Sequence, residues 1–190
     1  MLLPLERLLR RAPPDSREAE LGALRARFRA QPSAREAGPE AVASAARLRE
    51  LRVALSAAFA NVEACHGCGR RRPEPHGHWA GGACCGSRTL DLFTQEEVES
   101  LALTGVRARD LAPPRGDHAG CAFRGEGGCS LAPEHRPNLC VRYVCLELRA
   151  ELLEKPEWRR ISELGAALRD ELARFSALRA AREGRSTNAP

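Results

Sequence analysis

Eight cysteines gather in one stretch of the chain, and the rest of the chain has none. They are Cys65, Cys68, Cys84, Cys85, Cys121, Cys129, Cys140 and Cys145. An even number of cysteines suits the disulfide framework of a secreted protein, but Glu6 and Arg7 interrupt the apolar start before a signal-peptide core could form. We therefore expect a cytoplasmic chain. In a reducing compartment, clustered cysteines indicate a metal site rather than disulfides.

Composition narrows the remaining classes of protein. The 190 residues are 43% hydrophobic and 29% charged, which suits one compact soluble domain with helical extensions. No apolar run approaches the ~20 residues of a membrane-spanning helix, so we expect no membrane association. The net charge of +5 comes from arginines interleaved with acidic residues, which we interpret mainly as surface charge. Aromatic residues make up only 4%, and the shortage of rings for base stacking makes nucleic acid an unfavoured partner.

Apolar residues repeat with helical spacing on both sides of the cysteine segment. On the N-terminal side the stripes are Leu21, Leu24 and Phe28, and then Leu48, Leu51, Leu55, Ala58 and Val62. On the C-terminal side the stripe is Ile161, Leu164, Leu168, Leu172 and Phe175. The prolines and glycine of residues 31–39 predict a break between the first two helices, and a short helix is expected at residues 2–10.

The cysteine segment has its own local signals. Thr94 and Glu97 form a capping-box pattern that predicts a helix ending near Gly105. CAFRGEGGC, residues 121–129, predicts a small hairpin with a cysteine on each arm. Pro137 suits the first turn of a helix over residues 138–145, which must end or distort between Cys140 and Cys145 if both are to face one centre.

These signals together predict a mostly α protein in which helices flank a small irregular Cys-rich metal-binding region with one short β-hairpin. The expected divisions are an N-terminal helical segment at 1–64, a Cys-cluster metal-binding domain at 65–145, C-terminal helices at 146–182 and a disordered tail at 183–190. The Cys-rich segment has little apolar periodicity, so we expect it to need its metal in order to fold.

The order of the cysteine motifs resembles a known family. Cys65 and Cys68 form a two-spaced pair followed by Gly69, and GGA precedes the vicinal pair Cys84–Cys85. GCAFRGEGGCSL and EHRPNLCVRYVC follow, at residues 120–131 and 134–145. This order resembles the YkgJ-type cysteine-cluster family, described as a zinc- or iron-chelating domain and distantly similar to the cysteine cluster of flagellin lysine methylases. In that family the first two pairs nearly abut, whereas here an insertion at about residues 70–82 separates them.

The resemblance implies metal binding by all eight cysteines, and thiolate-only ligation suits zinc or an iron–sulfur cluster. The sequence leaves these two cofactors open. Histidines at 66, 76, 78, 118 and 135 are alternative ligands, and arginines at 70–72, 124, 136 and 142 are candidates to compensate the negative charge of a thiolate centre.

Three functions fit this pattern. The first is a metal-binding protein that serves as a structural, carrier or redox module, and this function is compatible with a protein partner. The second is an iron–sulfur-dependent modifying enzyme of the flagellin-methylase type, for which no catalytic residue is identified. The third is a zinc-knuckle interaction module.

Overall fold

The computed structural model describes residues 17–60, 62, 88–115, 121–125, 128–144 and 146–187. The predicted helix at 2–10, the insertion at 70–82 and five of the eight cysteines lie outside these residues. Within them the protein is mostly helical, as predicted. The helices are α2 (Arg17–Arg29), α3 (Ala34–Ala37), α4 (Pro39–Ala58), α6 (Thr89–Leu92), α7 (Gln95–Leu103), α8 (Asn138–Arg142), α9 (Leu146–Leu153) and α10 (Glu157–Thr187). Two short 3-10 helices, η1 (Ala108–Asp110) and η2 (Pro133–His135), complete the helical elements described.

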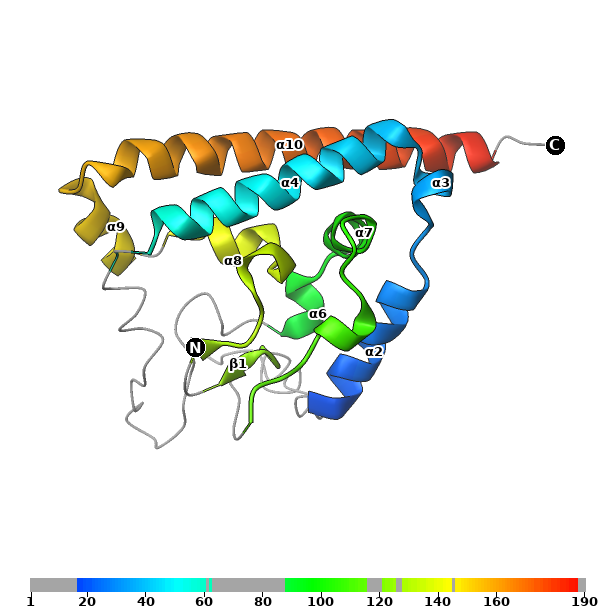
Figure 1. Ribbon diagram of the computed structural model, residues 1–190, viewed down its shortest axis with the longest axis horizontal. Helices are drawn as coiled ribbons and strands as arrows, with labels where there is room; N and C mark the ends of the chain where they lie inside the picture. The colour runs from blue at the N-terminus through cyan, green and yellow to red at the C-terminus, as the bar shows by residue number, and fades with distance from the viewer. Residues whose placement is uncertain are drawn as a thin grey trace, which may run out of the picture.

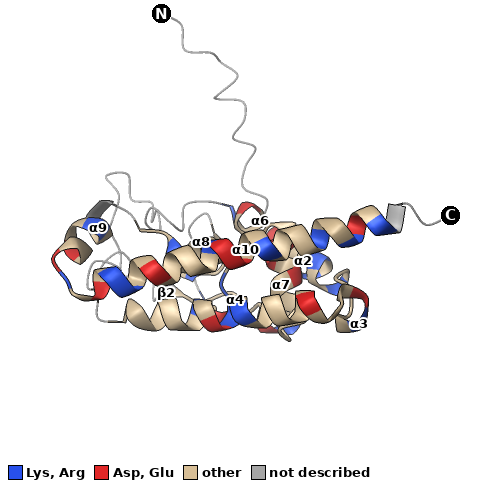
Figure 2. Cartoon of the chain, turned by 90° about the horizontal axis from the view of Figure 1, so that it is seen from above, with Lys and Arg blue, Asp and Glu red and all other residues tan. Residues whose placement is uncertain are grey.

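The longest helices, α4 and α10, lie side by side and run in opposite directions along one edge of the molecule (Figure 1). Their facing stripes are those that the helical spacing predicted. Leu48, Leu55, Leu168 and Phe175 have no exposed surface, and they join one hydrophobic cluster with α8 and α9. Basic and acidic residues are interspersed on the outer surfaces of both helices, as expected for solvated faces (Figure 2).

A second hydrophobic cluster connects α2 to the cysteine-bearing segment. Phe93 lies between two other rings, 6.4 Å from Phe28 and 5.7 Å from Phe123 between ring centroids. Leu24, Val98 and Leu101 fill the space around them. Although the sequence segment looked poor in apolar periodicity, its described part has a core of its own. That core packs against the N-terminal helix α2.

Several arginines that we had interpreted as surface charge form hydrogen bonds to the backbone of other elements or are buried. In α2, Arg25 donates to the carbonyl oxygen of Leu111 at 2.8 Å, and Arg27 donates to that of Phe93 at 3.1 Å. In α4, Arg52 is completely buried. Unpaired carbonyls at the ends of helices and loops need donors, and a long guanidinium side chain can reach them from a neighbouring helix.

The ends of the helices follow local chemistry. A full capping box at Ser33 and Glu36 begins α3, inside the predicted break at 31–39. Gly105 (φ 98°) ends α7 where it was predicted. There the N–H of Gly105 donates to Ala102 and that of Val106 to Leu101, which is the Schellman pattern. Val106 and Leu101 are both buried, so an apolar contact accompanies it.

One of the predicted helix ends was confirmed and another was wrong. The helix that follows Pro137 ends between Cys140 and Cys145, as expected, because α8 stops at Arg142. The final helix is longer than predicted, since α10 continues through residues 183–187, which we expected to belong to a disordered tail. Ion pairs between Arg179 and Glu183 within α10, and between Arg182 and Glu99 of α7, stabilise this last part of the helix. None of the described helices is long and apolar enough to cross a membrane.

Candidate metal centre

Three of the eight predicted ligands lie within the described residues, and all three pack against the cluster around Phe93. Cys121 is part of that cluster and is 7% exposed, while Cys129 and Cys140 are partly buried against it. Cys121 and Cys129 belong to the hairpin segment, and Cys140 belongs to α8. The other five predicted ligands, Cys65, Cys68, Cys84, Cys85 and Cys145, lie outside the described residues.

The hairpin forms where it was predicted, with strands β1 (Arg124–Gly125) and β2 (Gly128–Cys129) paired antiparallel. Cys129 is the register partner of Arg124, and Cys121 precedes β1 by a turn in which the N–H of Arg124 donates to its carbonyl oxygen. The backbone of Gly125 lies against Pro114, where a Cβ atom would come within 2.7 Å of the proline ring. Only glycine fits this contact, so the hairpin is held closely against the preceding loop.

The surroundings of Cys121 keep its thiol protonated. Burial raises the pKa of Cys121 to about 11, and the N–H of Phe123 partly opposes this shift. The nearby Cys129 and Glu20 raise it further, while the hydroxyl of Thr89 lowers it. A thiol in this state is a poor free nucleophile. It becomes a ligand when a cation displaces its proton.

Thr89 and Glu20 also organise the polypeptide around this thiol. The hydroxyl oxygen of Thr89 accepts a hydrogen bond from the N–H of Ala122 at 2.8 Å. Glu20, which is buried in α2, pairs with Arg88 at 3.2 Å. The first turns of α6 and α2 therefore hold the backbone next to Cys121.

A buried polar network fixes the start of α8, the helix that carries Cys140. One carboxylate oxygen of Glu97 accepts the backbone N–H of Asn138 at 2.8 Å, and the other lies 3.1 Å from a guanidinium nitrogen of Arg52. Arg52 donates to the side-chain oxygen of Asn138 at 2.7 Å and to Ser100 at 2.8 Å. This network connects α4, α7 and α8, so the position of Cys140 is linked to the helical core.

Burial opposes both charges of the central pair in this network. It lowers the pKa of Arg52 and raises the pKa of Glu97, and in each case the partner's charge works in the opposite direction. The capping-box pattern had assigned the Glu97 side chain to the start of α7. Thr94 does accept the N–H of Glu97, but the Glu97 carboxylate turns inward to Arg52 and Asn138.

The residues proposed for charge compensation differ in their surroundings. Arg124 is buried on β1 opposite Cys129, and Arg136 donates to the carbonyl oxygen of Leu131 at 2.9 Å. Arg142 is exposed at the end of α8. His135, in η2, is partly buried, and the other predicted histidines and Arg70–Arg72 lie outside the described residues.

The requirement that the helix end between Cys140 and Cys145 is met, because α8 stops at Arg142 and Tyr143 has extended backbone. Across the described ranges, no group of three or more His, Cys, Asp or Glu side chains is placed to hold a metal ion. A complete thiolate centre would therefore have to draw donors from the cysteines beyond these ranges.

Sequence reasoning missed the network of Arg52, Glu97, Ser100 and Asn138. A signal was present, since Arg52 lies four residues after Leu48 and three before Leu55, on the apolar face of α4. A charged residue at such a position requires a buried partner, and Glu97 and Ser100 share the inward side of α7.

Comparison with known proteins identified no relative of this chain. The chain matches no protein-family model, no curated protein and no solved structure.

Proposed function

We propose that this chain is a metal-binding cysteine-cluster protein of the YkgJ type, in which thiolates from the eight cysteines hold zinc or an iron–sulfur cluster. The observation that carries the proposal is the position of Cys121, Cys129 and Cys140. The two elements that bear them are separated in sequence, yet all three sulfur-bearing side chains pack against the same hydrophobic cluster. Soft thiolate donors at the border of an apolar core suit zinc and iron–sulfur centres.

The donors present fit such a centre in chemistry as well as position. Cys121 and Cys129 are close enough for the charge of one to raise the pKa of the other, so a cation between them would relieve that repulsion. Arg124, opposite Cys129, brings positive charge to the same hairpin. Cysteines bind a metal only while they are reduced, so the protein would work in a reducing compartment such as the cytoplasm. There the centre would have a structural, carrier or redox role.

Metal analysis of protein purified without oxygen tests the proposal. A brown protein with a thiolate-to-iron absorption band would identify an iron–sulfur cluster, and a colourless protein with stoichiometric zinc would identify a zinc site. Cys121→Ser, Cys129→Ser and Cys140→Ser should each lower the bound metal per chain. Ser130→Ala is the matched control, because it removes the hydrogen bond from Ser130 to Ala112 in the same hairpin but no thiol.

The proposal fails if the purified protein carries neither zinc nor iron. It also fails if metal per chain is unchanged in all three cysteine variants.

A further inference from the structure

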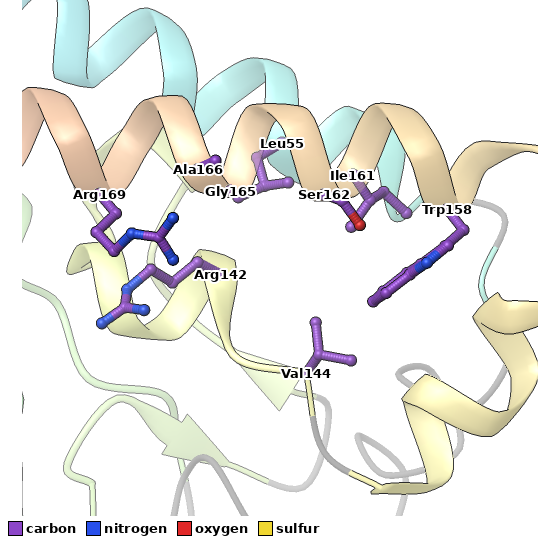
Figure 3. A pocket seen from close by; sticks show the side chains of 9 residues that line it. All are labelled: Leu55, Arg142, Val144, Trp158, Ile161, Ser162, Gly165, Ala166 and Arg169. Atoms are coloured by element: carbon purple, nitrogen blue, oxygen red, sulfur yellow. The ribbon is translucent and has the colours of Figure 1, made fainter.

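A pocket of about 240 Å³ lies where the first turns of α10 pass the end of α4 and the connection that follows α8 (Figure 3). One end of it is basic. Arg142 from α8 and Arg169 from α10 bring their guanidinium groups toward each other there. None of the described residues that line the pocket is acidic.

Among the described residues, neither arginine has a close ion pair of its own, because the carboxylate of Glu97, whose pKa the charge of Arg142 helps to lower, is already paired with Arg52. Arg142 has no ion pair with any described residue. Arg169 has only a loose pair, 3.8 Å long, with Asp170, and both side chains of that pair are exposed. An exposed pair of this kind contributes little, so both guanidinium groups can take a shared anion.

The other end of the pocket is apolar. The indole ring of Trp158 faces Val144 across the opening, and Leu55 and Ile161 lie behind them (Figure 3). A flat aromatic wall opposite a branched aliphatic side chain suits a ring. The pocket is therefore basic at one end and apolar at the other.

The floor of the pocket is left open by a glycine. Gly165 lies within α10, where glycine is an unfavourable helix residue, and a Cβ atom added there would meet no atom within 4 Å. The volume is below the roughly 300 Å³ at which pockets for drug-sized ligands begin, which limits a ligand to a small molecule.

We propose that this pocket binds a small aromatic carboxylate, with the carboxylate between Arg142 and Arg169 and the ring against Trp158. Planar guanidinium groups match a carboxylate in bidentate geometry, and the ring covers apolar surface that is otherwise exposed. This proposal does not depend on the metal centre.

Phenylacetate is the probe, and the fluorescence of Trp158 is the readout. The chain has two tryptophans, so the background variant is Trp79→Phe, which leaves Trp158 as the only reporter. We expect phenylacetate to change this fluorescence saturably. The neutral analogue phenylacetamide should bind at least tenfold more weakly.

Three further variants locate the site. Arg142→Gln/Arg169→Gln should weaken phenylacetate binding at least tenfold, and Gly165→Leu should abolish it by filling the floor without harming the helix. Arg160→Gln, an exposed arginine of α10 outside the pocket, is the control and should bind normally. Helicity by circular dichroism and metal content per chain are recorded for every variant.

Absence of saturable binding would overturn the proposal, as would equal binding of the amide or undiminished binding in the double arginine variant. Tighter binding of phenyl phosphate than of phenylacetate would also overturn it and assign the basic end to phosphate.

Discussion

Arg52 shows how a single buried charge organises the segment that carries Cys140. Its guanidinium has no exposed surface and reaches Glu97, Ser100 and Asn138. A buried cation is tolerated only with a counter-charge and hydrogen-bond acceptors. The three partners come from α7 and α8, so these elements must be in place before Arg52 can be buried.

Glu97→Gln should therefore be strongly destabilising. The amide keeps the size of the side chain but leaves the Arg52 cation without its counter-charge, and we expect a loss of about 3–5 kcal/mol in the free energy of unfolding. Urea denaturation of the purified variants measures it. Glu50→Gln is the control, because the Arg47–Glu50 pair is exposed and its loss should cost less than about 0.5 kcal/mol. Equal effects of the two substitutions would contradict a dominant role of burial.

Substitution of glycine by alanine should have opposite effects on stability at Gly105 and at Gly22. Gly105→Ala should lower the free energy of unfolding by about 1–2 kcal/mol, because φ is 98° there and an L-residue is strained. Gly22→Ala, in the middle of α2 with open space around it, should raise the free energy by about 0.5–1 kcal/mol. Thermal and urea unfolding compare them, and a stabilising Gly105→Ala would refute the role of the Schellman motif.

At the residue scale, the sequence predicted the end of α7 and the turn of the hairpin better than it predicted buried pairs. Gly105 and the hairpin glycines have a local meaning that can be seen in the sequence. Arg52 and Glu97 are 45 residues apart, and their pairing depends on how α4 and α7 pack. Arginine carries nearly all the positive charge of this chain, so composition alone could not separate this one from its exposed neighbours.

At the scale of elements, α7 connects the two hydrophobic clusters and holds the far end of α10. Glu99 of α7 is almost completely buried and lies 3.1 Å from Arg179 and 2.6 Å from Arg182. Glu96 adds a longer contact with Arg179, 3.3 Å. The periodic apolar stripes predicted α2, α4 and α10, and the capping-box pattern predicted α7. The extent of α10 beyond Arg182 depends on these contacts with α7, which no local pattern contains.

Glu99→Gln should loosen the end of α10 without unfolding its start. The variant leaves Arg179 and Arg182 facing a neutral group, so amide hydrogens of residues 176–185 should exchange roughly tenfold faster, while those around Leu168 stay unchanged. Hydrogen-exchange mass spectrometry measures both regions. Arg159→Gln, which removes an exposed pair near the start of α10, should leave the end of the helix unaffected. Faster exchange along all of α10 would instead indicate global destabilisation.

At the scale of the whole molecule, two hydrophobic clusters carry most of the described structure. One is centred on α4 and α10, and the other joins α2 to α6, α7 and the hairpin segment. The sequence predicted the first cluster from its stripes. Of the second cluster it predicted only the stripe of α2, because the other residues that meet around Phe93 come from short, separate segments without periodicity. The placement of Cys121, Cys129 and Cys140 depends on that second cluster.

Removal of the proposed metal should therefore unfold only part of the chain. The poor apolar periodicity of residues 65–145 had implied that this whole segment needs the metal in order to fold. The strands β1 and β2 are two residues each, too short to persist alone, whereas α4, α7 and α10 are held by apolar packing that requires no thiolate. After chelation under reducing conditions, amides of residues 121–125 and 128–142 should lose protection, while those of α4, α7 and α10 keep it within about threefold. Hydrogen exchange of matched metal-bound and metal-free samples gives both values. Loss of protection in α4 and α10 would mean that the metal supports the entire fold, and unchanged protection of the hairpin would mean that the metal is bound elsewhere.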